Sequence, residues 1–291
     1  MNDLPTEALG RLERFLGRDH DGVGELGRTR VLLHGQKRPR AIVLLHGLSA
    51  SPTQFSRFAI ELHQRGLNVL VPRLPKHGYS DRLSDALAGM TEAGLLQTAR
   101  ESVALAHDFG DRVTVAGFSL GGLLAAWIAQ HEEVERAIAI APFLGVSWIP
   151  NRWMSPLAEV ALMLPNRFQW WNPIARERQM PTHGYPRFAT HALARSYRLA
   201  NIVMHDAATQ ALHAREMLFV TNANEAAVNN RAVHRLADRM RIHSDANVEL
   251  VEIGDLPMSH DIIEPLRNPN LADRVYPQLL ELIDPSVGVR T

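Results

Sequence analysis

The sequence contains no cysteine among its 291 residues. Disulfide bonds, thiolate nucleophiles and cysteine-ligated metals are therefore excluded. It also lacks a charge excess of either sign, because 31 lysines and arginines balance 31 aspartates and glutamates. A formal net charge of zero argues against a nucleic-acid-binding protein and against a polybasic membrane-surface protein.

Long apolar runs are absent as well. No stretch approaches the roughly 18 apolar residues that indicate a membrane-spanning helix. Residues 1–20 mix charged side chains throughout and contain no apolar core of signal-peptide length. We therefore expect a soluble, cytoplasmic protein without a membrane span.

Sequence signatures of metal or nucleotide chemistry are also missing. No HExxH motif occurs, and the pairs His183/His191 and His205/His213 lie eight residues apart without a neighbouring carboxylate motif. No GxGxxG follows a strand pattern, and no glycine-rich phosphate loop is found. The sequence predicts neither a metal nor another cofactor.

What is present is an alternation of short apolar β-type runs with amphipathic helical stretches. Strands that are apolar on both faces, separated by helices, are typical of an α/β protein whose mostly parallel sheet has helices on both faces. The predicted strands cover residues 29–34, 41–46, 68–72, 112–117, 134–142, 216–222 and 247–253. The predicted helices cover residues 51–66, 91–110, 120–131 and 225–242, followed by a C-terminal helix. We expect the first two strands to form a hairpin through the polar turn Gln36–Pro39.

The alternation breaks between residues 143 and 205. The sequence therefore predicts one core domain, built from residues 1–142 and 206–291, with 143–205 inserted as a helical cap. The inserted segment holds four of the five tryptophans, which are Trp148, Trp153, Trp170 and Trp171. These rings either attach the cap to the core or line an apolar substrate pocket, and both roles stay open at this point.

The strongest chemical motif is G-x-S-x-G, formed by Gly117, Ser119 and Gly121 between a predicted strand and a predicted helix. A serine on such a sharp turn is held in strained backbone geometry, and small flanking residues avoid clashes around it. Its hydroxyl then lies near a helix N-terminus, where the helix dipole favours developing negative charge.

From residue 28 onward the chain resembles the α/β-hydrolase family, with its mostly parallel central sheet and inserted cap. The loop 73–81, RLPKHGYSD, is similar to the R-x-P-x-HG loop of bacterial carboxylesterases and monoacylglycerol lipases. The resemblance implies a Ser–acid–His triad in that chain order. It also implies an oxyanion hole made of two backbone N–H groups, one after the nucleophile and one in an early loop.

The early loop must follow one of two LLHG copies, residues 32–35 and 44–47. The first runs into a polar turn and another strand. The second runs into a loop of small residues that opens a helix, so we assign it to the site. On this interpretation the backbone N–H groups of Leu48 and Leu120 form the oxyanion hole.

The resemblance places the base after the last strand and the acid after the strand before it. His260 is the only histidine between the last predicted strand and the C-terminus. For the acid, Asn222, Glu225 and Val228 match the family spacing G-x-x-D-x-x-V with glutamate in place of aspartate. The alternative acids are Asp255 and, more distantly, Asp206. Asp261 and Glu264, beside the histidine, are interpreted as solvated or ion-pairing residues.

These assignments predict a serine hydrolase that cleaves short- to medium-chain or monoacylglycerol-like carboxylic esters through a Ser119–His260–Glu225 triad and an acyl-enzyme. Two alternatives stay open. One is a peptidase or amidase of the same fold, similar to proline aminopeptidases, although the cap offers few acids, Glu159 and Glu177 among them. The other is a non-catalytic protein that binds a small apolar ligand. The expected partner is a small-molecule ester and not nucleic acid, and the oligomeric state is left open.

Overall fold

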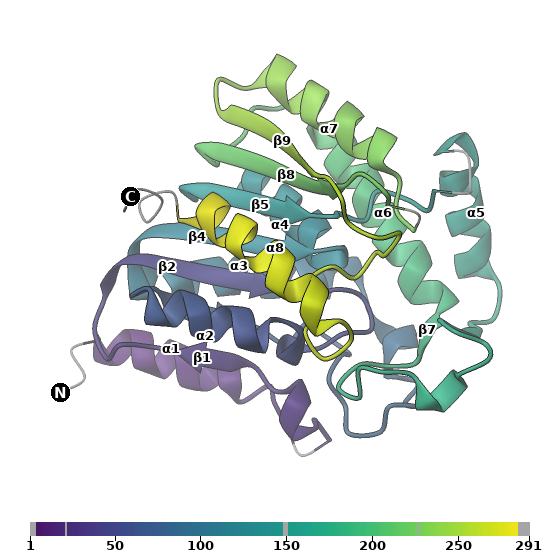
Figure 1. Ribbon diagram of the computed structural model, residues 1–291, viewed down its shortest axis with the longest axis horizontal. Coiled ribbons are helices and arrows are strands. Elements are labelled where there is room, and N and C mark those ends of the chain that lie inside the picture. The colour runs from purple at the N-terminus through teal and green to yellow at the C-terminus, as the bar shows by residue number, and fades with distance from the viewer. Residues whose placement is uncertain (1–3, 21, 148–150, 226, 285–291) are drawn as a thin grey trace.

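The computed structural model describes residues 4–20, 22–147, 151–225 and 227–284. Its centre is a seven-stranded, mostly parallel sheet with helices on both faces, which confirms the predicted fold class (Figure 1). The sheet strands are β1 (Arg30–Leu32), β2 (Arg38–Leu45), β3 (Asn68–Val71), β4 (Gly110–Phe118), β5 (Arg136–Ile140), β8 (Glu216–Asn222) and β9 (Asn247–Ile253).

The strands are ordered β1-β3-β2-β4-β5-β8-β9, and only the pairing of β1 with β3 is antiparallel. The predicted hairpin between the first two strands is therefore wrong, because β3 lies between them. Residues 41–45 of β2 are wholly buried, and parallel partners on both sides, β3 and β4, cover them. A hairpin with β1 would have occupied the edge that β3 takes.

The helices are α1 (Thr6–Leu16), α2 (Ser56–Gln64), α3 (Glu92–Phe109), α4 (Leu120–His131), α5 (Asn151–Met163), α6 (Thr190–Asp206), α7 (Asn230–His243) and α8 (Pro269–Ile283), with short 3-10 turns η1 (Glu25–Gly27), η2 (Pro52–Phe55), η3 (Ala86–Gly89) and η4 (Arg176–Arg178). Figure 1 shows α2 and α8 in front of the sheet and α3 and α4 behind it. On the front face the rings of Phe58 and Tyr276 meet edge to face at 4.9 Å.

Helix α7 begins at Asn230, five residues after the predicted start at 225. The Asn229 side chain accepts a hydrogen bond from the Ala232 N–H and so caps the helix there. The later start leaves residues 223–225 and 227–229 outside any helix, after the carboxyl end of β8. Glu225 therefore does not lie on a helix.

The segment between β5 and β8 contains α5, α6 and a two-stranded antiparallel sheet made of β6 (Phe168–Trp170) and β7 (Arg187–Ala189). Small strands thus accompany the helices expected there. Helix α6 packs against α4, where the buried Gln130 side chain donates to the Val203 carbonyl at 2.9 Å. Within the described residues, no helix is both long and apolar enough to cross a membrane.

A buried ion pair attaches the N-terminal segment to the sheet. Arg73, just after β3, donates to the Asp19 carboxylate at 2.7 Å, and each side chain is 8% exposed. The same carboxylate accepts the Thr29 N–H at 2.6 Å. Removing one partner of such a pair leaves the other charge buried without compensation.

We expect Asp19→Ala to lower the free energy of unfolding by about 3 kcal/mol, because it leaves the Arg73 guanidinium buried and unpaired. Urea denaturation followed by circular dichroism measures the change. The matched control is Asp238→Ala, since the Asp238 carboxylate is 66% exposed and pairs with Arg241 on the surface of α7. That control should cost less than about 1 kcal/mol. Equal losses in the two variants would contradict the importance of the buried pair.

Candidate active site

Ser119 lies at the junction of β4 and α4 with φ 55° and ψ −109°, a backbone conformation that side-chain-bearing residues rarely adopt. Its N–H donates to the Ile140 carbonyl of β5 at 2.9 Å, which fixes the turn against the sheet. A Cβ at Gly117 would come within 2.0 Å of the Gly121 carbonyl, and a Cβ at Gly121 within 1.9 Å of the Leu45 carbonyl. Both glycines are therefore required for the turn to pack.

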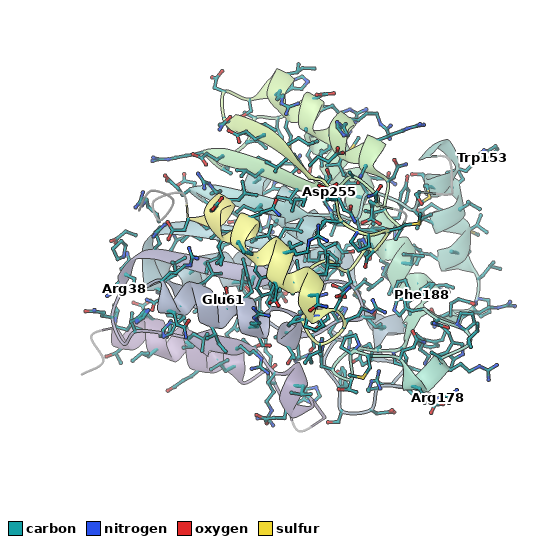
Figure 2. All side chains as sticks on the ribbon, viewed as in Figure 1. Arg38, Glu61, Trp153, Arg178, Phe188 and Asp255 are labelled. Atoms are coloured by element: carbon teal, nitrogen blue, oxygen red, sulfur yellow. The ribbon has the colours of Figure 1, made fainter. Side chains whose placement is uncertain are left out.

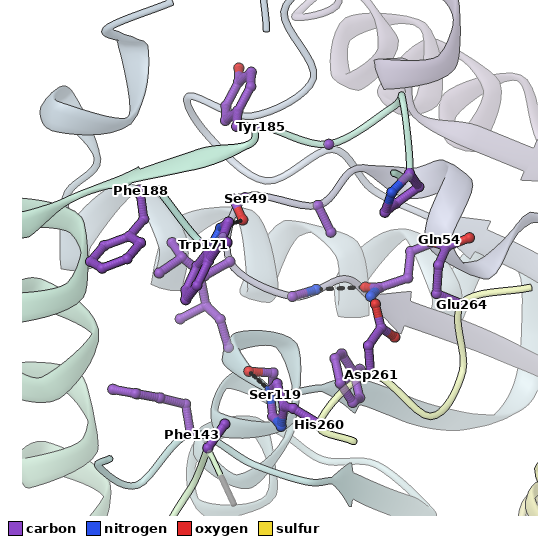
Figure 3. Close-up of a pocket in the computed structure, with 18 of the residues that line it drawn as sticks. Ser49, Gln54, Ser119, Phe143, Trp171, Tyr185, Phe188, His260, Asp261 and Glu264 are labelled. Atoms are coloured by element: carbon purple, nitrogen blue, oxygen red, sulfur yellow. Dashed lines mark hydrogen bonds between the residues drawn. The ribbon is translucent and has the colours of Figure 1, made fainter. Parts of the chain in front are cut away.

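Three of the predicted site residues meet at this turn. Ser119 Oγ lies 2.9 Å from His260 Nε2, and His260 Nδ1 lies 2.9 Å from Glu225 Oε2. Figure 3 shows the hydroxyl and the imidazole side by side at the base of a pocket. The three residues come from the ends of β4, β8 and β9, which share one edge of the parallel sheet. The geometry allows the imidazole to exchange a proton with the serine hydroxyl.

The Glu225 carboxylate is held in its charged form. Burial by itself opposes ionisation, but the hydrogen bond and the charge of His260 lower the pKa of Glu225 below its ordinary value, helped by two backbone N–H groups. These donors are Ala227 at 2.7 Å and Val228 at 3.3 Å, both to Oε1. Because Oε1 is occupied by the loop backbone, Oε2 is aimed at the imidazole.

The two alternative acids lie elsewhere. Asp255 is exposed on the loop after β9, and its carbonyl accepts a hydrogen bond from Arg274 (Figure 2). Asp206 ends α6, and its carboxylate lies 3.1 Å from Nε2 of His131. Neither carboxylate contacts His260, so Glu225 is the acid that meets the imidazole.

The two LLHG copies have different surroundings. In the first copy the His34 ring stacks on His63 at 3.9 Å, and the following Gly35 is not among the pocket residues. In the second copy Gly47 and Leu48 line the pocket beside Ser119. The Gly47 N–H donates to Gln54 Oε1 at 2.9 Å, and this hydrogen bond fixes the loop to the helical turn that follows it.

His46 fixes the second copy from inside the protein. It is completely buried, and burial together with the nearby His77 ring lowers its pKa well below the ordinary value. The neutral ring accepts the Leu74 N–H at Nε2, at 3.1 Å, so its proton is on Nδ1. Among the residues described, none accepts a hydrogen bond from the N–H of Leu48 or of Leu120. Both donors are thus available to an atom in the pocket.

The pocket has a volume of about 510 Å³ and is mostly apolar. Its apolar wall comes from the sheet and from the segment between β5 and β8, and includes Phe118, Phe143, Val146, Trp171, Phe188 and Leu193. Of the four tryptophans predicted as pocket residues, Trp171 is in this wall, whereas Trp153 and Trp170 are not. Trp153 is 54% exposed on α5 (Figure 2), and Trp148 lies outside the described residues.

The opposite wall is polar, with Gln54, Asp261, Glu264 and Arg267. Asp261 and Glu264 were expected to be solvated or ion-pairing, and the structure shows the pairing alternative for both. Glu264 is buried and lies 2.8 Å from His183, and Asp261 lies 3.7 Å from Arg267. Burial and the neighbouring Glu264 charge raise the pKa of Asp261 to about 6.

Sequence reasoning missed Gln54 and His183. Gln54 lies in the helical turn after the second LLHG copy. The sequence pattern identified this loop as part of the site but gave no reason to select the Gln54 side chain. His183 carries no local signal, because its partners are more than 80 residues away along the chain. Nowhere in the described ranges do three or more histidine, aspartate or glutamate side chains gather as a metal site would require.

Comparisons with known proteins agree with this architecture. A sequence model described as the alpha/beta hydrolase family matches residues 42–263. The esterase YjfP of Escherichia coli (strain K12) is 32% identical over 107 residues, which cover 34% of this chain and 43% of the esterase. The matched region thus spans less than half of that relative.

Solved structures resemble the chain over most of its length. The monoacylglycerol lipase of Paleococcus ferrophilus superposes with a TM-score of 0.65 at 16% identity, covering 88% of this chain and 97% of the lipase. A soluble variant of monoglyceride lipase from Saccharomyces cerevisiae gives 0.68 at 12% identity, covering 89% and 90%. At these identities the likeness shows the fold alone. Because the family model covers most of the chain and the architecture agrees with it, the chain belongs to the α/β-hydrolase family.

Proposed function

We propose that this protein is a serine hydrolase that cleaves carboxylic esters through an acyl-enzyme. The observation that carries the proposal is the continuous chain of hydrogen bonds from Ser119 through His260 to Glu225, at the base of a mostly apolar pocket. The printed names of its relatives, an esterase and monoacylglycerol lipases, support the same class of reaction.

In the first step Ser119 Oγ attacks the ester carbonyl carbon, and its proton passes to His260 Nε2. The N–H groups of Leu48 and Leu120 stabilise the tetrahedral oxyanion. The Glu225 carboxylate keeps the Nδ1 proton in place and stabilises the imidazolium. The alcohol then leaves with the proton from Nε2, which gives the acyl-enzyme.

In the second step His260 removes a proton from water, and the resulting hydroxide attacks the acyl carbonyl. The tetrahedral intermediate collapses, Ser119 regains its proton from His260, and the carboxylic acid is released. In this proposal residues 143–205 form a cap over the core, and its apolar wall binds an uncharged acyl chain of short to medium length. The alcohol part of the ester then lies against the polar side chains of the opposite wall.

Ser119→Ala should abolish hydrolysis of p-nitrophenyl esters while the protein stays folded, because it removes the nucleophile. Only the residual catalysis of the oxyanion hole and binding should remain, about 10³–10⁴ over water. A fluorophosphonate probe should label the unmodified protein and not the variant. Wild-type turnover by the variant, or labelling that survives the substitution, would refute the assignment. A protein that binds an apolar ligand without catalysis should not be labelled in either form.

Glu225→Gln should lower kcat at least about 100-fold, because the amide can present an N–H donor to His260 where the imidazole needs an acceptor. The corresponding change in serine proteases lowers kcat roughly 10⁴-fold, and we expect a smaller loss here. The matched control is Asp255→Asn, which should stay within about threefold of wild type, since the exposed Asp255 side chain does not meet the imidazole. Steady-state kinetics at pH 8 measures both. A reversed pattern would assign the acid role to Asp255.

Phe188→Ala should change the preference for acyl-chain length, because Phe188 is part of the apolar wall of the pocket. Losing part of this wall should lower kcat/KM for the longest good ester by about 10-fold while an acetate ester changes little. Trp153→Ala is the control, an aromatic of the same segment outside the pocket lining. Matched amides in the same panel test the peptidase alternative. A uniform fall across the ester series would mean that Phe188 only supports the fold.

A further inference from the structure

A second Ser–His–Glu chain of hydrogen bonds ends at Glu264, in the polar wall of the pocket. Ser51 Oγ is 3.0 Å from His183 Nδ1, and His183 Nε2 is 2.8 Å from Glu264 Oε2. Ser51 and the side chains of His183 and Glu264 are all 0% exposed. A nucleophile must reach its substrate, so this buried hydroxyl is not a second catalytic serine. The chain needs another explanation.

The hydrogen-bond partners determine where the protons are. The Ser51 hydroxyl has one hydrogen, which it donates to the Leu26 carbonyl at 3.0 Å. His183 Nδ1 must therefore carry a proton and donate it to Ser51 Oγ. Glu264 Oε1 accepts the Leu266 N–H at 3.1 Å, which leaves Oε2 facing His183 Nε2 with one proton between them. The imidazole thus makes two directional hydrogen bonds, one on each side.

Those two hydrogen bonds join both halves of the proposed catalytic machinery. Ser51 ends the loop 47–51, which carries the Leu48 N–H. Glu264 is on the loop after β9, the same loop that carries His260. His183 belongs to neither loop, but to the inserted segment. The His183 imidazole therefore links three parts of the protein: the loop 47–51, the loop that carries His260 and Glu264, and the segment between β5 and β8.

Two further hydrogen bonds hold the same loop from the same segment. Trp171 Nε1 donates to Ser49 Oγ, and the Tyr185 N–H donates to the Ser49 carbonyl, each at 2.7 Å. Ser49 has φ 61°, so its peptide groups take an unusual orientation that these donors stabilise. Figure 3 shows Ser49, Trp171 and Tyr185 on one side of Ser119 and Glu264 on the other.

We propose that His183 is a positioning residue that sets the loop 47–51 and the loop 260–264 relative to each other. This inference rests on the proposed function, because it assigns catalytic work to those two loops. The imidazole keeps the Leu48 N–H and the His260 ring at the spacing that the tetrahedral intermediate requires. The inserted segment then completes the active site and is not merely a cover for the substrate.

Two substitutions separate the two hydrogen bonds. In His183→Asn the side-chain NH₂ takes the place of Nδ1, so it can donate to Ser51 but does not reach Glu264. In His183→Gln the NH₂ takes the place of Nε2, so it can donate to Glu264 but not to Ser51. Each variant should lose about 10-fold or more in kcat, since small misplacements of catalytic groups cost up to about 100-fold. KM for a short ester should change less than about threefold, because no substrate contact is removed.

Ser51→Ala supplies the decisive measurement. It should lower kcat in the wild-type and His183→Asn backgrounds, where the side chain at position 183 donates to Ser51. In the His183→Gln background, where that hydrogen bond is already lost, it should have almost no further effect on kcat. The control is His191→Ala, a half-buried histidine of the same segment whose Nε2 lies 2.8 Å from the Leu164 carbonyl. That control should keep kcat within about twofold of wild type.

Rates are taken per Ser119 site labelled by the fluorophosphonate, so unfolded protein does not enter kcat. The proposal is overturned if the variants lower the melting temperature but leave kcat per labelled site unchanged. It is equally overturned if Ser51→Ala has the same effect in all three backgrounds, because the hydrogen bond would then not act through His183. Failure of the proposed function looks different: the wild-type protein itself would show no Ser119-dependent ester hydrolysis.

Discussion

The left-handed backbone of Ser119 is the constraint on which the rest of the site depends. With φ at 55°, the residue leaves β4 and enters α4 within a single step, and its hydroxyl is raised above the end of the sheet. The conformation is held by the Ile140 carbonyl, which accepts the Ser119 N–H, and by the Ser119 carbonyl, which accepts the Leu123 and Phe143 N–H groups. Strain at a functional residue persists when its surroundings over-determine it in this way.

The parallel sheet supplies the remaining groups at the same place. Carboxyl ends of parallel strands share one edge, so the loops after β2, β4, β8 and β9 come together although they are distant in sequence. Glu225 and His260 reach Ser119 because β8 pairs with β9 and with β5. The glutamate differs from aspartate by one methylene, and the loop accommodates it by giving Oε1 two backbone donors.

The segment between β5 and β8 forms part of the pocket wall. It makes hydrogen bonds to the loop 47–51 and contributes apolar side chains to the pocket. This division has a physical reason, since directional hydrogen bonds fix a loop in one orientation while an apolar wall accepts chains of various shapes. Arg82 extends the polar contact, because its guanidinium donates to the Gly184 and Gln179 carbonyls at 2.9 and 2.8 Å.

The sequence by itself determined the α/β fold class and the positions of α4, β8 and β9, because apolar periodicity and the flanking turns are local properties. It also singled out Ser119 by its strand–turn–helix context, and the resemblance to the α/β-hydrolase family added His260 and Glu225 through their order in the chain. Only the tertiary structure decided that β3 lies between β1 and β2. Both edges of β2 are taken by parallel strands, β3 and β4, so β1 pairs with β3 instead. The packing of the segment between β5 and β8 likewise decides that Trp171 lines the pocket and that Trp153 does not. The same packing brings His183 to Ser51 and Glu264. Contacts between residues more than 80 positions apart leave no pattern in the local sequence, so the packing of the whole chain decides them.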